Sequence, residues 1–341
     1  MMQGLRTAFL MAIVGATISP GSTFAQSANG GPDAAAEPHA PALAPLAVGS
    51  LQMASNADLI IEKIDVAVTI DQVVVSYALR NKGAGDLSLA ASIAMPGLQR
   101  AADSGEIWRL PAATPENPAG LSVAVDGAPI AARAEVKAYA LGVDRQAEIK
   151  AAHLPLLPFA PEMDKAIGDL SPQSLAELSA LGILSPRDPE EPGRKISPDW
   201  TLEVVHSWRQ ALPAGKTTML TVKYAPLKAE ARYGKADALD LEDLKDEACL
   251  SPQAIAAAQG RLKAANSVLK AVEIALVNAP PLRWFDSPTP TVSVQKPERE
   301  AIVGFCGIDS KSADQPIVRG SEIGGQDPTD FRILIFEPIT Q

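Results

Sequence analysis

The chain has 341 residues, of which 47% are hydrophobic, and this is enough for one large folded domain or two small ones. Its formal net charge of −10 argues against nucleic acid or an anionic membrane surface as a partner, because both attract basic proteins. After residue 25, no segment is long and apolar enough to cross a membrane. The nearest candidate, residues 254–277, is interrupted by four charged side chains.

Residues 1–25 have the parts of a secretory signal peptide. Arg6 supplies positive charge, residues 8–16 form a short apolar core, and small residues at 23 and 25 precede Gln26. We therefore expect cleavage before Gln26 and an exported protein, periplasmic or secreted, of a Gram-negative-type bacterium. A buried N-terminal helix and an uncleaved membrane anchor are the alternatives, but the apolar run is shorter than the roughly 20 residues that a membrane span needs.

Residues 26–47 are rich in alanine and proline and contain few large apolar side chains. Such a segment cannot bury enough surface to offset the entropy lost on ordering, so we predict a disordered tether. A β-rich globular body should then extend over residues 48–341, with helical insertions around 143–184 and 236–265.

Apolar residues alternate with polar ones from residue 65 onwards, the period of half-buried strands. The stretches 65–70, 73–79 and 87–93 predict three strands of an antiparallel meander, with a turn at 81–86. Asp126-Gly127 predicts a tight hairpin between 121–125 and a strand within 129–139, because these residue types tolerate positive φ.

Two helices have clear start signals, since Ser171-Pro172 and Ser251-Pro252 each combine an N-cap serine with proline at the first helical position. Gly182 should close the first helix. Further strands are expected at 200–208, 218–224, 268–277, 292–294, 301–305 and 331–336, with a turn at 213–216. The pattern predicts a mainly β (α+β) protein: an antiparallel β-sandwich with helical insertions.

Cys249 and Cys306 are the two cysteines of the chain. In an oxidising compartment an even number of cysteines favours a disulfide, so we predict a Cys249–Cys306 bridge. Two separate buried thiols are the alternative.

Several stretches of the chain together resemble a known bacterial family. An acidic-aliphatic strand at 59–70 is followed by Val75-Ser76-Tyr77-Ala78-Leu79-Arg80-Asn81 and by a strand ending in Pro96. Later stretches at 125–127, 142–144, 154–159, 208–226 and 305–307 follow in the same order. This set is similar to domain-of-unknown-function family 4424. The resemblance implies an exported envelope protein, and it implies no activity and no functional residues.

The sequence contains two candidate catalytic groups: an S-x-x-K pair and the histidines that a serine triad would need. Ser267 and Lys270 match S-x-x-K, but that chemistry needs a helix and partner motifs that the chain lacks. A serine triad needs a histidine, and the three are His39 in the tether, His153, and His206 on a strand face, where we expect a packed or edge residue. We therefore predict no catalytic residue.

The sequence gives equally weak evidence for a metal or cofactor site. The acidic run 237–247 lacks the turn glycine and ligand spacing of a calcium loop, so we expect a solvated helix face. Four tryptophans could stack on a sugar if exposed, although tryptophan in a sandwich is more often core: Trp108, Trp200, Trp208 and Trp284. We predict no metal ligands and no cofactor.

These observations favour an exported, non-catalytic binding or structural module whose partner is an unknown envelope protein or polymer. Two alternatives stay open. An envelope-glycan hydrolase would have two facing carboxylates about 5 to 10 Å apart. A small-ligand carrier would have a large apolar cavity between its sheets.

Overall fold

The computed structural model describes residues 46–100, 114–186, 195–234, 249–263, 267–277, 288–321 and 330–340. These residues form a mainly β protein with three sheets and few helices, which confirms the predicted fold class. The predicted signal peptide and nearly all of the predicted tether lie outside the described residues. No helix within the described ranges is long and apolar enough to cross a membrane.

The largest sheet has seven strands in the order β15-β13-β2-β3-β10-β5-β6. Its centre is the antiparallel set β2, β3 and β10, whereas β13 pairs with β2 in parallel. The strands are β2 (Leu59–Val68), β3 (Val73–Asn81), β5 (Ser122–Val125), β6 (Ala128–Ile130), β10 (Thr217–Tyr224), β13 (Thr291–Gln295) and β15 (Ile317–Gly320). A short 3-10 helix, η3 (Ser310–Ser312), precedes β15.

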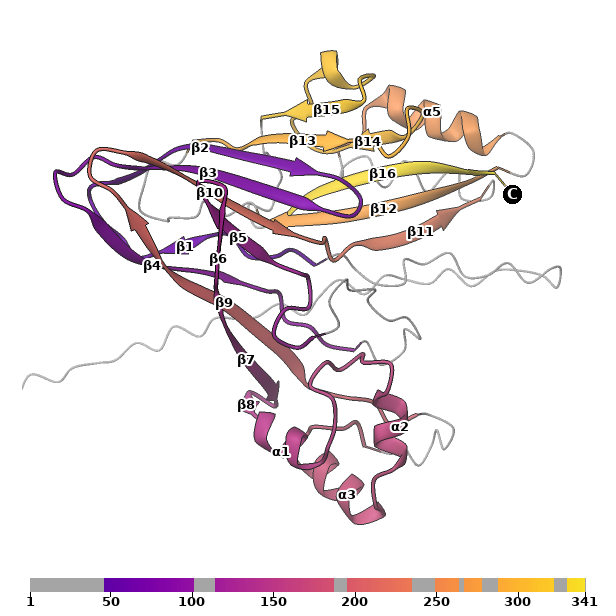
Figure 1. The fold of residues 1–341 in the computed structure, drawn as a ribbon. Helices are drawn as coiled ribbons and strands as arrows, with labels where there is room; N and C mark the ends of the chain where they lie inside the picture. Colours follow the sequence, from indigo (N-terminus) through magenta and orange to yellow (C-terminus); the bar gives the residue numbers. More distant parts are fainter. Residues whose placement is uncertain are drawn as a thin grey trace, which may run out of the picture. The chain divides into compact units, whose positions relative to one another are not determined.

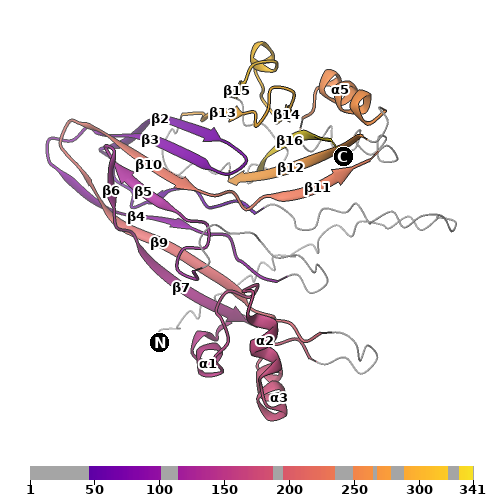
Figure 2. The same cartoon turned by 45° about the vertical axis from the view of Figure 1, so that its right-hand side comes forward.

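The second sheet has five strands in the order β1-β4-β9-β7-β8. Its strands are β1 (Gln52–Met53), β4 (Leu87–Ala94), β7 (Arg133–Ala140), β8 (Val143–Asp144) and β9 (Thr201–Leu212). Buried residues of this sheet and of the seven-stranded sheet belong to one hydrophobic cluster. The two sheets therefore share a core, as in a sandwich, and Figures 1 and 2 show β3 and β10 in one layer and β4 and β9 in the other.

The predicted meander is wrong between β3 and β4, because the chain crosses there from one sheet to the other. The turn 81–86 is longer than the two residues of a tight hairpin and can span the gap between layers. Asn81 anchors the crossing: its amide nitrogen donates to the carbonyls of Gly85 (2.8 Å) and Leu212 (2.9 Å). Its carbonyl accepts the N–H of Gly83 at 2.9 Å.

The turn 213–216 makes the same kind of crossing, from β9 to β10. Asp86 of the first crossing accepts the N–H of Ala214 in the second at 2.8 Å. Asn81 reaches Leu212, the last residue of β9, so both crossings are joined by side-chain hydrogen bonds. Residues 218–224 thus form the predicted strand, but that strand pairs with β3 and β5 and not with β9.

The Asp126-Gly127 hairpin is confirmed between β5 and β6, and both turn residues have positive φ (48° and 81°). The predicted second strand within 129–139 is instead two strands, β6 and β7, which belong to different sheets. Every second residue from 130 to 138 is at least partly buried. Partly buried and exposed side chains alternate without interruption from β6 into β7. The sequence pattern therefore does not show that this segment forms two strands.

Three short helices follow β8: α1 (Gln146–Ala151), α2 (Met163–Gly168) and α3 (Pro172–Ala180). Figure 1 shows them beyond the end of β7 and β8. The start signal of α3 is confirmed, since the Ser171 hydroxyl accepts the N–H of Ser174 at 3.1 Å. Gly182, with φ of 69°, follows the helix as predicted and places the chain in the left-handed region that glycine favours.

The third sheet has four strands in the order β11-β12-β16-β14, with helix α5 (Pro252–Leu262) beside it (Figure 1). Its strands are β11 (Ala229–Tyr233), β12 (Ser267–Val277), β14 (Ile302–Gly304) and β16 (Asp330–Thr340). The Ser251 hydroxyl caps α5 by accepting the N–H of Ala254 at 3.1 Å, as predicted. Leu262 of α5 and Phe336 of β16 are both fully buried in a separate small cluster.

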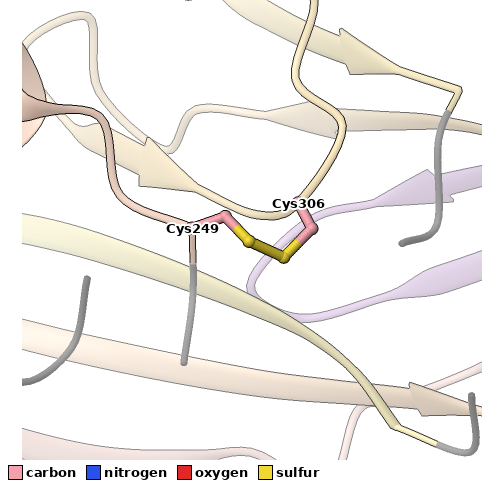
Figure 3. Close-up of a disulfide and its surroundings, with 2 residues drawn as sticks. All are labelled: Cys249 and Cys306. Atoms are coloured by element: carbon pink, nitrogen blue, oxygen red, sulfur yellow. A yellow bond between two sulfur atoms is a disulfide. The ribbon is translucent and has the colours of Figure 1, made fainter. Parts of the chain in front are cut away.

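Cys249 and Cys306 form the disulfide that the sequence predicts, with their Cα atoms 4.9 Å apart (Figure 3). Cys249 precedes the cap of α5, and Cys306 follows β14. The bridge therefore ties the start of α5 to the edge of the four-stranded sheet.

Candidate functional site

The interior face of β9 carries the residues from which we build the candidate site. Alternate positions from 202 to 212 are buried, as the period of a strand with one face on a core requires. Most of these side chains are apolar. His206 is an exception, because its imidazole is only 4% exposed although it can hydrogen-bond through two nitrogens.

His206 differs from the other polar side chains of this row. Trp208 donates its indole N–H to Gln210 at 3.1 Å, and Gln210 donates to the carbonyl of Ala211 at 2.9 Å. By contrast, Nε2 of His206 is buried and has no hydrogen-bond partner. A buried polar atom without a partner costs about 1–3 kcal/mol, so its position needs an explanation.

His206 lines a cavity of about 200 Å³. The cavity lies where the chain crosses from β6 to β7, so it has walls from both sheets of the sandwich. Ala134 of β7 is the direct cross-strand neighbour of His206. The lining residues are Glu116, Asn117, Leu121, Ser122, Val123, Ile130, Ala132, Ala134 and His206.

A short loop before β5 forms the polar side of the cavity. Asn117 holds this loop in place, since its side-chain oxygen accepts the N–H of Leu121 at 2.7 Å and its nitrogen donates to the Leu121 carbonyl at 3.0 Å. Glu116, next to it, is exposed and forms no ion pair with any residue that the structure describes. Glu116 is thus the acidic residue among the described residues that line the cavity.

Burial determines the charge state of His206. Desolvation lowers the pKa of this imidazole below its ordinary value of 6.5, because the charged form loses its hydration. The ring is therefore neutral at pH 7. A neutral imidazole has one donor and one acceptor nitrogen, so Nε2 can accept a hydrogen bond when the proton is on Nδ1.

Ser267 and Lys270 both lie on strand β12 and not on a helix. The Lys270 ammonium forms an ion pair with Glu230 at 3.0 Å. The helix that S-x-x-K chemistry requires is therefore absent at these described positions.

The remaining candidate residues are the other histidines, the tryptophans and the acidic run. His153 is exposed, with φ of 56°, just after the end of α1, and His39 lies outside the described residues. Trp200 and Trp208 are buried at 1% and 8% exposure, which confirms their prediction as core residues. Trp108, Trp284 and the whole acidic run 237–247 lie outside the described residues. Within the described ranges, no group of three or more metal-ligating side chains comes together.

Sequence reasoning singled out His206 but missed the cavity. Glu116, one of the other polar lining residues, lies 90 positions from His206 in the chain, and only the packing of two sheets places both at one cavity. The alanines at 132 and 134 also do not indicate a cavity, because alanine occurs equally in strands that pack without one.

A family model, "Domain of unknown function (DUF4424)", matches residues 42–318, which is more than three quarters of the chain. The chain belongs to this family. The match includes every residue that lines the cavity, and it includes the stretch Val75–Asn81, whose last residue anchors the crossing between the sheets.

No curated protein matches the chain. Among solved structures, the chain is similar to a Legionella pneumophila protein described as a "putative nutrient binding protein". The two sequences are 10% identical, and the match covers 86% of this chain and 72% of the other with a TM-score of 0.39.

Proposed function

We propose that this protein is an exported, non-catalytic binding protein of a bacterial envelope, which holds a small ligand in the cavity at His206. The observation that carries this proposal is the cavity between the two sheets, which the buried residue His206 helps to line.

The size of the cavity favours a small ligand. Pockets for drug-sized molecules usually measure about 300–1,000 Å³. At about 200 Å³, this cavity suits a compound of few non-hydrogen atoms or one group of a larger molecule. The sequence predicted a large apolar cavity for a small-ligand carrier, and this cavity is smaller and partly polar, so the proposal is limited to a small ligand.

The lining argues against the glycan-hydrolase alternative. That chemistry uses two carboxyl groups on opposite sides of the bond that breaks, about 5 to 10 Å apart. Among the described residues that line the cavity, Glu116 alone carries a carboxylate. Binding without bond cleavage requires only one hydrogen-bonding group and a matching shape.

Two features support export. Residues 1–25 have the charge, apolar core and cleavage site of a signal peptide. The Cys249–Cys306 disulfide is of the kind that persists in oxidising compartments such as the periplasm.

The binding proposal is tested by filling the cavity. Ala134→Leu adds a larger side chain beside His206, whereas Ala131→Leu makes the same change at an exposed neighbouring position outside the cavity. The mature chain is titrated with a panel of small amines, alcohols, carboxylates and amides, and the imidazole signals of His206 are followed by NMR.

At least one compound should saturate the His206 signals of the unsubstituted protein and of Ala131→Leu, but not those of Ala134→Leu. The proposal is wrong if no compound of the panel gives a saturable change, or if Ala134→Leu binds as the unsubstituted protein does.

A further inference from the structure

Residues 128–132, which we call the flap, contribute to the lining of the same cavity as His206. We propose that the cavity opens at mildly acidic pH, because protonation of His206 favours a state in which the flap is displaced from the sandwich. This inference rests on the cavity of the proposed function and adds how access to it is regulated.

The flap is held by few backbone hydrogen bonds. It consists of β6 and the two residues before β7, and its Ile130 and Ala132 line the cavity. Among the described strands, β6 pairs with β5 alone, over three residues, because it is the outermost strand of its sheet. Pro129 has no N–H to donate to that pairing. Such a segment opens at a lower free energy than the core, so the flap can open while the sandwich stays folded.

His206 lies in surroundings that do not stabilise a positive charge. The residue is 4% exposed, and its Nε2 is buried without a hydrogen-bond partner. Its cross-strand neighbours are Ile93 of β4 and Ala134 of β7, which are both apolar. A protonated imidazole carries a hydrogen on each nitrogen, so the closed structure would hold a charged donor without an acceptor. Burial accordingly lowers the pKa of this ring.

The charged residues around His206 do not compensate for this charge. Arg133 and Glu135 alternate with Ala134 along β7, so their side chains lie on the opposite face of the sheet. Glu116 is the titratable residue among the other described lining residues, and it is exposed. Desolvation accounts for the lowered pKa of His206, without an opposing contribution from a carboxylate.

The described lining residues on the side of the seven-stranded sheet include Leu121, Val123 and Ile130, which are uncharged. Two tyrosines of the same sheet, Tyr77 and Tyr224, are buried in the shared core. Burial raises the pKa of both, that of Tyr77 to about 12, so both stay neutral between pH 5 and pH 7. Within this pH range, His206 is therefore the core group whose charge changes.

Opening of the flap lets water reach the ring from the cavity, and the ring then titrates near the ordinary pKa of about 6.5. The open state binds the proton more tightly than the closed state, so its population rises as the pH falls below 6.5. Between pH 7 and pH 5, the opening equilibrium should increase by at least about threefold and at most about 25-fold, the limit for a closed protein that takes up no proton.

Hydrogen exchange measures this opening without any ligand. The mature, full-length protein is exchanged at pH 5, 6 and 7, and the rates of the β6 amides are corrected for the intrinsic pH dependence of exchange. The corrected opening of β6 should increase as stated above and should change little in about 1 M urea, because a local opening exposes little surface. Amides of β3 and β10, at the centre of the sheet, should be more strongly protected.

His206→Gln replaces the imidazole with an amide that does not titrate, so the pH dependence of the β6 opening should be lost. A second measurement needs no substitution: the NMR titration of His206 in the unsubstituted protein should give a pKa below 6.5. A pKa of 6.5 or above would overturn the inference even if His206→Gln does not fold.

Three control variants remove other titratable groups and should keep the pH dependence. Asp126, in the turn between β5 and β6, accepts the N–H of Met219 at 2.8 Å, and Asp126→Asn keeps this acceptor but does not titrate. Glu116→Gln removes the acidic residue of the described lining. His153→Gln removes an exposed histidine outside the cavity.

The inference fails if the β6 opening changes by less than about twofold between pH 7 and pH 5, or if His206→Gln keeps the change. It also fails if a control variant abolishes the change, or if β6 exchanges only by global unfolding, with the protection and urea dependence of β3 and β10. If the flap opens with pH but no compound of the panel binds, the binding function is wrong and the pH-dependent opening stands. The reverse result leaves the binding function and removes its regulation.

Discussion

Asn81 offers the sharpest test of how the two sheets are held together. Its side chain is fully buried and makes three hydrogen bonds: to the carbonyls of Gly85 and Leu212 and from the N–H of Gly83. Each such bond contributes about 1 kcal/mol net. Asn81→Ala also leaves the buried Leu212 carbonyl without this donor, which adds about 1 kcal/mol or more. We expect a total loss of about 4 kcal/mol in the free energy of unfolding.

The assay is urea-induced unfolding, followed by the fluorescence of the buried tryptophans Trp200 and Trp208. Asn56→Ala is the control, because it removes the same side chain where it accepts one exposed hydrogen bond, from the N–H of Asp58. That variant should lose less than about 1 kcal/mol. Equal losses in the two variants would refute the idea that Asn81 anchors the crossing.

Asn81→Asp removes the two hydrogen bonds that the Asn81 side chain donates and keeps the one that it accepts. The carboxylate can still accept the N–H of Gly83 but cannot donate to the carbonyls of Gly85 and Leu212. It also places a negative charge in a buried position. This variant should therefore be at least as unstable as Asn81→Ala, and a stability close to that of the unsubstituted protein would show that the two donated bonds contribute little.

Three further predictions concern the disulfide, the pH dependence of stability and processing. The Cys249–Cys306 bridge closes a loop of sequence separation 57, so its loss in the double variant Cys249→Ser/Cys306→Ser should cost about 4 kcal/mol of unfolding free energy by the chain-entropy estimate. Titration of the denatured, unreduced protein should find no free thiol, and two thiols per chain would contradict the bridge. Burial lowers the pKa of His206, so the imidazole is protonated at a higher pH in the unfolded chain than in the folded protein. The free energy of unfolding should therefore be highest above pH 6.5 and decline below it. Urea unfolding of His206→Gln should lack this decline. The carboxyl groups of Asp144 and Asp164, whose pKa values are lowered from 3.8, act only at more acidic pH. Intact-mass analysis of exported protein should place the first residue at or near Gln26, and a retained Met1 would exclude cleavage.

The sequence by itself determined the local features of this fold. Alternating burial along β9 and β10 follows directly from the period of two in their side chains. Ser171 and Ser251 cap helices in the structure because an N-cap depends on residues only three positions apart. The disulfide was also predictable, since the two cysteines allow a single intramolecular pairing.

Tertiary structure decided which strands pair and where the cavity lies. A period of two shows which side chains share a face, but it does not say which sheet a strand joins. For this reason, the sequence pattern predicts that the turns at 81–86 and 213–216 link neighbouring strands of one sheet, whereas each turn crosses between sheets. Glu116 and His206 line the same cavity only because β5, which follows the Glu116 loop, and β9 belong to different sheets of the sandwich, and no local pattern in either segment encodes that packing.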